Sequence, residues 1–146
     1  MLIRFLIACG VFLMSSIAAG EAARPDKGSL LTADRLELVS PVRCLDRAGD
    51  GKFVRVDIAR VTNPGEVPLA FQVHFQHGES AREYLGSFAL FPASNPGRFI
   101  VPTGGVLNDE GKVILVMEPL PDDQAADAVE VWVRSVDLTD GLGTTR

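Results

Sequence analysis

Apolar and polar residues alternate along short runs of the chain, which is the pattern of β-strands with one face in a core. The clearest run is 53–61, where Val54, Val56 and Ile58 share one face and charged residues lie between them. The run at 112–117 is apolar on both faces, which predicts a central strand. Together these patterns predict seven strands, at 36–42, 53–61, 69–75, 84–91, 98–101, 112–117 and 128–138.

Turn-forming residues separate the runs. Asn63-Pro64-Gly65-Glu66 is typical of a turn, because proline presets its own φ and glycine accepts a positive φ. Short strands joined by short turns indicate an all-β, antiparallel, immunoglobulin-like β-sandwich of about seven strands. The only helical competitor is 122–128, for one or two turns at most.

The first twenty residues differ in kind from the rest. Arg4 precedes an apolar stretch at 5–14, and small residues dominate 15–20. This layout predicts a secretory signal peptide at 1–20. Because the apolar stretch is shorter than the roughly 18 residues of a membrane span, we expect no stable span after cleavage.

Cleavage is expected after Gly20, with Ala22 as the second choice and a lipoprotein-type box ending at Cys9 as a minor alternative. An exported chain is periplasmic or secreted. The rest of the sequence then divides into three parts, namely a polar tether at 21–34, a β-sandwich domain at 35–140 and a flexible C-terminus at 141–146.

The charge balance is acidic, with 14 Lys and Arg against 19 Asp and Glu and a net charge of −5. Loss of Arg4 with the leader makes it −6. Basic residues alternate with acidic ones along the chain, which argues against nucleic-acid binding and against docking to an anionic membrane. We therefore expect a soluble monomer whose partner is another envelope or secreted protein.

Cys44 stands alone once Cys9 has left with the leader, so it cannot form an internal disulfide. Its position two residues after Val42 predicts a buried thiol at the end of an edge strand. An intermolecular bridge and a metal thiolate are the alternatives.

His74 and His77 are the only histidines, and their spacing raises the question of a metal site. Residues three apart in a strand point to opposite faces, so both imidazoles can meet one ion only if the strand ends between them. Gly78 leaves that possibility open. If a metal is bound, copper is the candidate, with Met117 or Cys44 as further ligands because thioether and thiolate suit Cu(I).

Catalytic groupings are absent from the sequence. Ser80, Ser87 and Ser94 lack a Gly-x-Ser-x-Gly elbow, and paired carboxylates fall in expected turns. The chain is therefore expected not to be an enzyme. A small hydrolase acting through Ser87 or Glu83 is the least favoured alternative.

Two stretches carry a family resemblance: Lys52-Phe53-Val54-Arg55-Val56-Asp57 and Tyr84-Leu85-Gly86-Ser87-Phe88. They resemble the Lys-Phe-Asp-Val type of C-terminal β-sandwich domain found in tyrosinases and plant polyphenol oxidases. The resemblance continues at 112–119 and 129–131 and implies a domain that shields a copper site or binds a partner. No copper ligand carries over, and the dicopper helices of the family are missing.

The leading hypothesis is a non-catalytic, exported β-sandwich that binds or shields another protein. The candidate contact residues are the aromatic side chains Tyr84, Phe88, Phe91 and Trp132, although core packing is the simpler explanation for the phenylalanines. Gly86, inside a strand pattern, predicts a bulge or a close backbone approach. The alternative function is a copper-associated accessory protein of the cell envelope.

Overall fold

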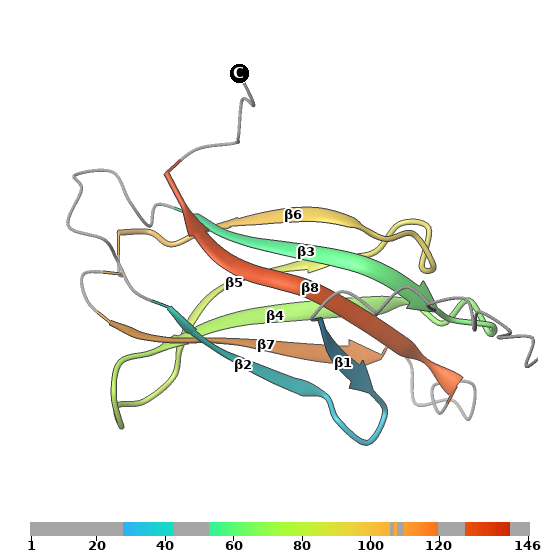
Figure 1. Cartoon of the computed structure of the whole chain (residues 1–146), viewed down its shortest axis with the longest axis horizontal. Helices are drawn as coiled ribbons and strands as arrows, with labels where there is room; N and C mark the ends of the chain where they lie inside the picture. The colour runs from blue at the N-terminus through green and yellow to red at the C-terminus, as the bar shows by residue number, and fades with distance from the viewer. Residues whose placement is uncertain (1–27, 43–52, 106, 108–109, 120–127, 141–146) are drawn as a thin grey trace, which may run out of the picture.

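The computed structural model describes residues 28–42, 53–105, 107, 110–119 and 128–140. Strands account for most of them (Figure 1). The eight strands are β1 (Ser29–Thr32), β2 (Glu37–Val42), β3 (Phe53–Thr62), β4 (Leu69–Gln76), β5 (Glu83–Ala89), β6 (Gly97–Pro102), β7 (Gly111–Pro119) and β8 (Glu130–Thr139).

Two antiparallel four-stranded sheets pack face to face. One has the strand order β1-β8-β3-β6 and the other has the order β2-β7-β4-β5. The expectation of an all-β, antiparallel β-sandwich is confirmed. All seven expected strands are present, and β7 is central in its sheet as its two apolar faces indicated.

The connections between strands differ from those of an immunoglobulin domain. In that fold the first two strands share a sheet, whereas here β1 and β2 belong to different sheets. Eight strands in this order form a jelly roll. Strand patterns alone do not determine which sheet each strand joins, so the sequence predicts the sandwich but not its connections.

β1 was not expected. Its four residues fall within the stretch 21–34 assigned to a polar tether, and they pair with residues 130–133 of β8. Leu31 is fully buried and is the residue that draws this short strand into the core. Four residues with one buried side chain give too little periodicity to be recognised as a strand from sequence.

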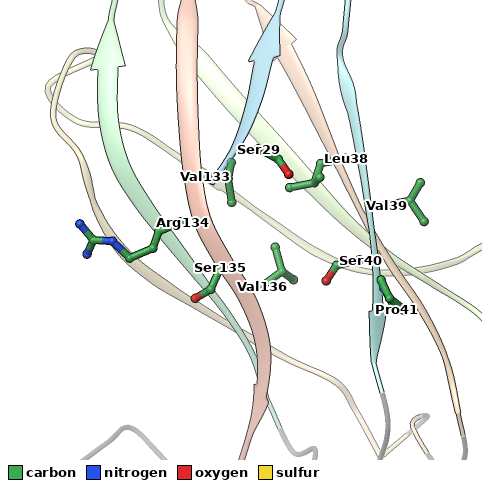
Figure 2. A pocket seen from close by; sticks show the side chains of 9 residues that line it. All are labelled: Ser29, Leu38, Val39, Ser40, Pro41, Val133, Arg134, Ser135 and Val136. Carbon is green, nitrogen blue, oxygen red and sulfur yellow. The ribbon is translucent and has the colours of Figure 1, made fainter. Parts of the chain in front are cut away.

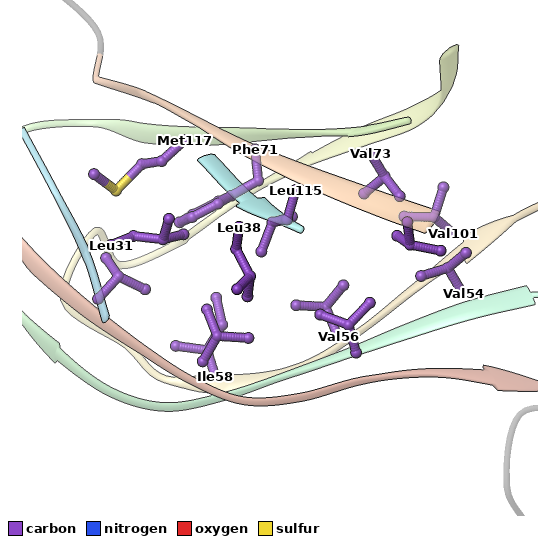
Figure 3. Close-up of a cluster of buried hydrophobic side chains, with 14 of the residues drawn as sticks. Leu31, Leu38, Val54, Val56, Ile58, Phe71, Val73, Val101, Leu115 and Met117 are labelled. Carbon is purple, nitrogen blue, oxygen red and sulfur yellow. The ribbon is translucent and has the colours of Figure 1, made fainter. Parts of the chain in front are cut away.

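The core lies between the two sheets (Figure 3). On β3 the buried side chains are Val54, Val56 and Ile58, the set that the alternation predicted. β4 alternates without a break, because every second residue from Leu69 to Phe75 is buried. Burial of these aliphatic and aromatic side chains provides the main favourable term in folding.

Gly86 fulfils both parts of its expectation. It pairs with Val73 at a register shift between β4 and β5, which is a β-bulge. A Cβ at Gly86 would also lie 2.8 Å from Cγ1 of Val101, on the opposite sheet. The missing side chain therefore lets the two sheets approach each other at this point.

Several sequence-based expectations concern segments outside the described residues. These are the signal peptide at 1–20, the thiol of Cys44, residues 122–127 of the helical competitor at 122–128, and the C-terminus at 141–146. Among the helices of the described segments, none is long and apolar enough to cross a membrane.

Candidate functional site

The solvent-facing side of the sheet β2-β7-β4-β5, called the outer face below, carries two of the residues singled out in the sequence. His74 on β4 is paired with Tyr84 on β5, and the two rings meet edge to face with centroids 5.5 Å apart. Tyr84 is 56% exposed. The structure therefore brings a candidate metal ligand and a candidate contact residue together at one place.

A short polar network fixes His74 on this face. His74 Nε2 lies 3.0 Å from Oε1 of Gln72, and Gln72 Nε2 donates to Oε1 of Glu118 at 2.7 Å. The three side chains are partly buried, so their mutual hydrogen bonds replace part of the water that they lose. The network therefore orients the imidazole of His74 on the outer face.

Glu37 and Arg82 form an ion pair on the outer face. The Arg82 guanidinium donates to both carboxylate oxygens of Glu37, at 2.8 and 3.1 Å. These bonds are the main cause of a lowered pKa of Glu37. Burial opposes them, and the charges of Arg82 and His74 add smaller lowering effects. The same pair raises the pKa of Arg82. Neither residue was singled out in the sequence, since they are 45 positions apart.

The metal interpretation gains no geometric support on the described part of the chain. β4 ends at Gln76, so His77 lies beyond the strand and is exposed. Met117 is buried in the core, on the side of the sheet away from His74. No cluster of three or more His, Cys, Asp or Glu side chains forms among these residues, and Cys44 is outside them.

Phe88 and Trp132, two of the four candidate aromatic contact residues, lie in different environments from Tyr84. Phe88 stacks between Phe71 and Phe99, at centroid distances of 5.0 and 4.3 Å, and so packs against the core. Trp132 lies on the other sheet, where the guanidinium of Arg60 is 5.1 Å from its ring centroid. Its buried indole nitrogen has no hydrogen-bond partner among the described residues. The aromatic residues thus do not form one contact patch.

Phe91, the fourth, is held out into solvent at the start of the β5–β6 loop, with 94% of its surface exposed. The preceding residue, Leu90, is buried, and its backbone nitrogen donates to Leu69 O at 3.1 Å. Two residues later, Ala93 O accepts a 3.2 Å hydrogen bond from Nδ2 of the buried Asn63. The loop is therefore fixed on both sides of an almost fully exposed phenyl ring.

Asn63 organises this end of the molecule and was missed as a functional candidate. Its Oδ1 accepts from Val67 N at 3.0 Å, and its Nδ2 donates to Val67 O at 2.8 Å as well as to Ala93 O. One buried amide thus ties the β3–β4 loop to the β5–β6 loop. The Asn-Pro-Gly signal predicted the turn correctly, but nothing in it indicated the second loop.

A groove of about 280 Å³ opens where β1, β2 and β8 meet (Figure 2). In Figure 2, Leu38, Val133 and Val136 fill the space between β8 and β2, whereas Arg134 and Val39 point away from it. Arg134 instead lies 3.7 Å from the carboxylate of Asp57 on the neighbouring strand. The groove is lined by Ser29, Leu38, Val39, Ser40, Pro41, Val133, Arg134, Ser135 and Val136.

The residues of the least favoured, hydrolytic alternative do not line this groove. Ser87 pairs with Gln72 and Glu83 pairs with Phe75, both along the edge strand β5. Both side chains are exposed. Comparison with known proteins assigns no activity either, because no family model and no curated protein matches the chain.

Proposed function

We propose that this chain is a non-catalytic, exported binding protein that contacts another protein through the loop end carrying Phe91. The observation that carries the proposal is the 94% exposure of a phenylalanine on a loop that buried neighbours hold in place. Exposing a phenyl ring to water costs free energy that a partner's apolar pocket would recover. Because the loop is already ordered, little conformational entropy is lost on binding.

Two further features support a binding role over a catalytic one. The groove between β8 and β2 holds aliphatic side chains and hydroxyl groups, and its one charged residue, Arg134, points elsewhere. The described polar residues of the outer face hydrogen-bond to one another. General acid–base catalysis needs charged groups gathered in a concave site. Export, which the leader-like N-terminus predicts, places the partner in the envelope or outside the cell.

The test is site-specific photocrosslinking of the full-length protein in cells. Benzoylphenylalanine at position 91 should yield one dominant covalent adduct with another protein. The matched control carries the same group at Glu79, which is exposed beyond the far end of β4, whereas the Phe91 loop lies beside Leu69 at the start of that strand. The adduct partner, once purified, should bind the wild type at least about tenfold tighter than Phe91→Ser, the loss expected of an anchor residue. The same adducts from both positions, or equal affinities, would rule the proposal out.

A further inference from the structure

Arg82 and Glu37 join the two edges of one sheet. Glu37 belongs to β2, Arg82 immediately precedes β5, and these are the outermost strands in the order β2-β7-β4-β5. The core fills the inner side of the sheet. The bidentate bond at 2.8 and 3.1 Å must therefore pass over β7 and β4 on the outer face.

The strand register shows what the pair passes over. Glu37 lies in the row of Val116 and Gln72. Arg82 immediately precedes Glu83, which pairs with Phe75 next to the last residue of β4. Between these two positions lies the row that contains Val39, Ile114 and His74. A line from Glu37 to Arg82 therefore crosses Ile114 on β7 and His74 on β4.

Ile114 is covered from outside. Its neighbours Val113 and Leu115 point into the core, so Ile114 points to the outer face, and it is not part of the core cluster. It is nevertheless only 1% exposed. Val39, which pairs with Ile114 on the neighbouring strand β2, is by contrast 48% exposed. Side chains of the outer face must therefore cover Ile114, and the Arg82–Glu37 pair crosses its row.

The segment that carries Arg82, residues 77–82 between β4 and β5, is called the strap. It is braced near β4, where Gln76 Nε2 donates to Ser80 O at 2.8 Å and Ser80 N donates to His77 O at 3.0 Å. Its far end is held by an ion pair whose side chains are both 44% exposed. Exposed ion pairs contribute little stability and weaken in salt, so the strap's attachment is easily released.

We propose that the strap is a lid over Ile114 and that the Arg82–Glu37 pair is the latch that holds the lid shut. Opening the latch leaves both sheets intact, because neither residue is in the core. It exposes an apolar row of Val39 and Ile114 beside Tyr84. The outer face therefore has a covered and an uncovered state, and the balance between them is independent of the Phe91 loop.

The experiment measures the solvent accessibility of isoleucine methyl groups in the full mature protein by NMR with a soluble paramagnetic probe. In the wild type, the protection of the Ile114 methyl signal should lie between that of Ile58, which is buried in the core, and that of Ile100, which is only partly buried. Glu37→Gln and Arg82→Gln should each raise the relaxation of Ile114 by about two- to fivefold, the population change expected for an exposed pair. Ile58 should not change.

The reversed pair, Glu37→Arg with Arg82→Glu, should restore the protection of Ile114, which a merely local disturbance would not do. Glu66→Gln, an exposed carboxylate at the opposite end of β4, is the matched control and should have no effect. An accessible Ile114 in the wild type, or equal protection in the single variants, would overturn the proposal.

Discussion

Asn63 and Ala93 are joined by a hydrogen bond of 3.2 Å that connects two loops 30 residues apart in the chain. The donor is a buried amide, so its loss leaves backbone groups of both loops without their partner. This single contact links the turn at the end of β3 to the position of Phe91. Its removal has consequences for both stability and binding.

Asn63→Ala should lower the free energy of unfolding by about 1–3 kcal/mol, because Val67 N and two carbonyl oxygens lose a buried partner. Urea denaturation measures this change. Hydrogen exchange should also accelerate in the loop at 91–96. An unchanged midpoint would show that the amide does not tie the loops together.

Substitution of Phe88 and of Phe91 by alanine should differ in its effect on stability. Phe88→Ala should cost about 3–5 kcal/mol, because it removes a ring stacked between Phe71 and Phe99. Phe91→Ala should change stability by about 0.5 kcal/mol or less, because the ring is in solvent. Thermal and chemical unfolding of the two variants compare them directly, and similar costs would contradict the assignment.

The Arg82–Glu37 pair should contribute to stability only when Glu37 is ionised. Because its folded pKa is lowered from 4.5, the contribution is complete above 4.5 and is lost as the pH falls through the folded value. His74, the other positive group acting on Glu37, works in the same direction. The stability difference between wild type and Glu37→Gln, measured by urea unfolding from about pH 7 to pH 2, should close only at the acidic end. A constant difference would contradict this.

A side chain at Gly86 should push the sheets apart. Its Cβ would lie 2.8 Å from Val101 Cγ1, a contact that requires the valine or the backbone to move. Gly86→Ala should therefore cost about 1–3 kcal/mol, as overpacked sites do. In a double-mutant cycle, Gly86→Ala and Val101→Ala together should cost less than the sum of their separate costs, because the truncated Val101 no longer meets the new Cβ. A neutral Gly86→Ala variant would show that the site relaxes freely.

Copper titration distinguishes the binding-protein proposal from the copper-accessory alternative. His74 Nε2 is engaged with Gln72, and Met117 lies on the opposite side of the sheet. We therefore expect His74→Gln to leave the affinity of the mature protein for Cu(I) and Cu(II) unchanged. Calorimetry measures it, and a site tighter than about millimolar that disappears in His74→Gln would favour the alternative.

Local patterns determined much of the fold. Alternation in β3 identified Val54, Val56 and Ile58 as core residues, and the uniform apolarity of β7 identified a central strand. These features can be predicted because the side chains of a strand point alternately to its two faces. A strand with one buried face therefore shows apolar residues at every second position. The bulge at Gly86 could also be predicted from the sequence, because a glycine inside a strand often marks a bulge or a close approach.

Tertiary structure alone decided which strands pair and which distant residues meet. The order β1-β8-β3-β6 depends on long-range packing, and the short β1 forms only because β8 offers it a partner. The same limit applies to the candidate sites. Phe88 and Phe91 are three positions apart, and only the neighbouring strands place one in a ring stack and the other in solvent. Arg82 and Glu37 meet because four strands lie side by side in one sheet, a contact between residues 45 positions apart that no local pattern contains.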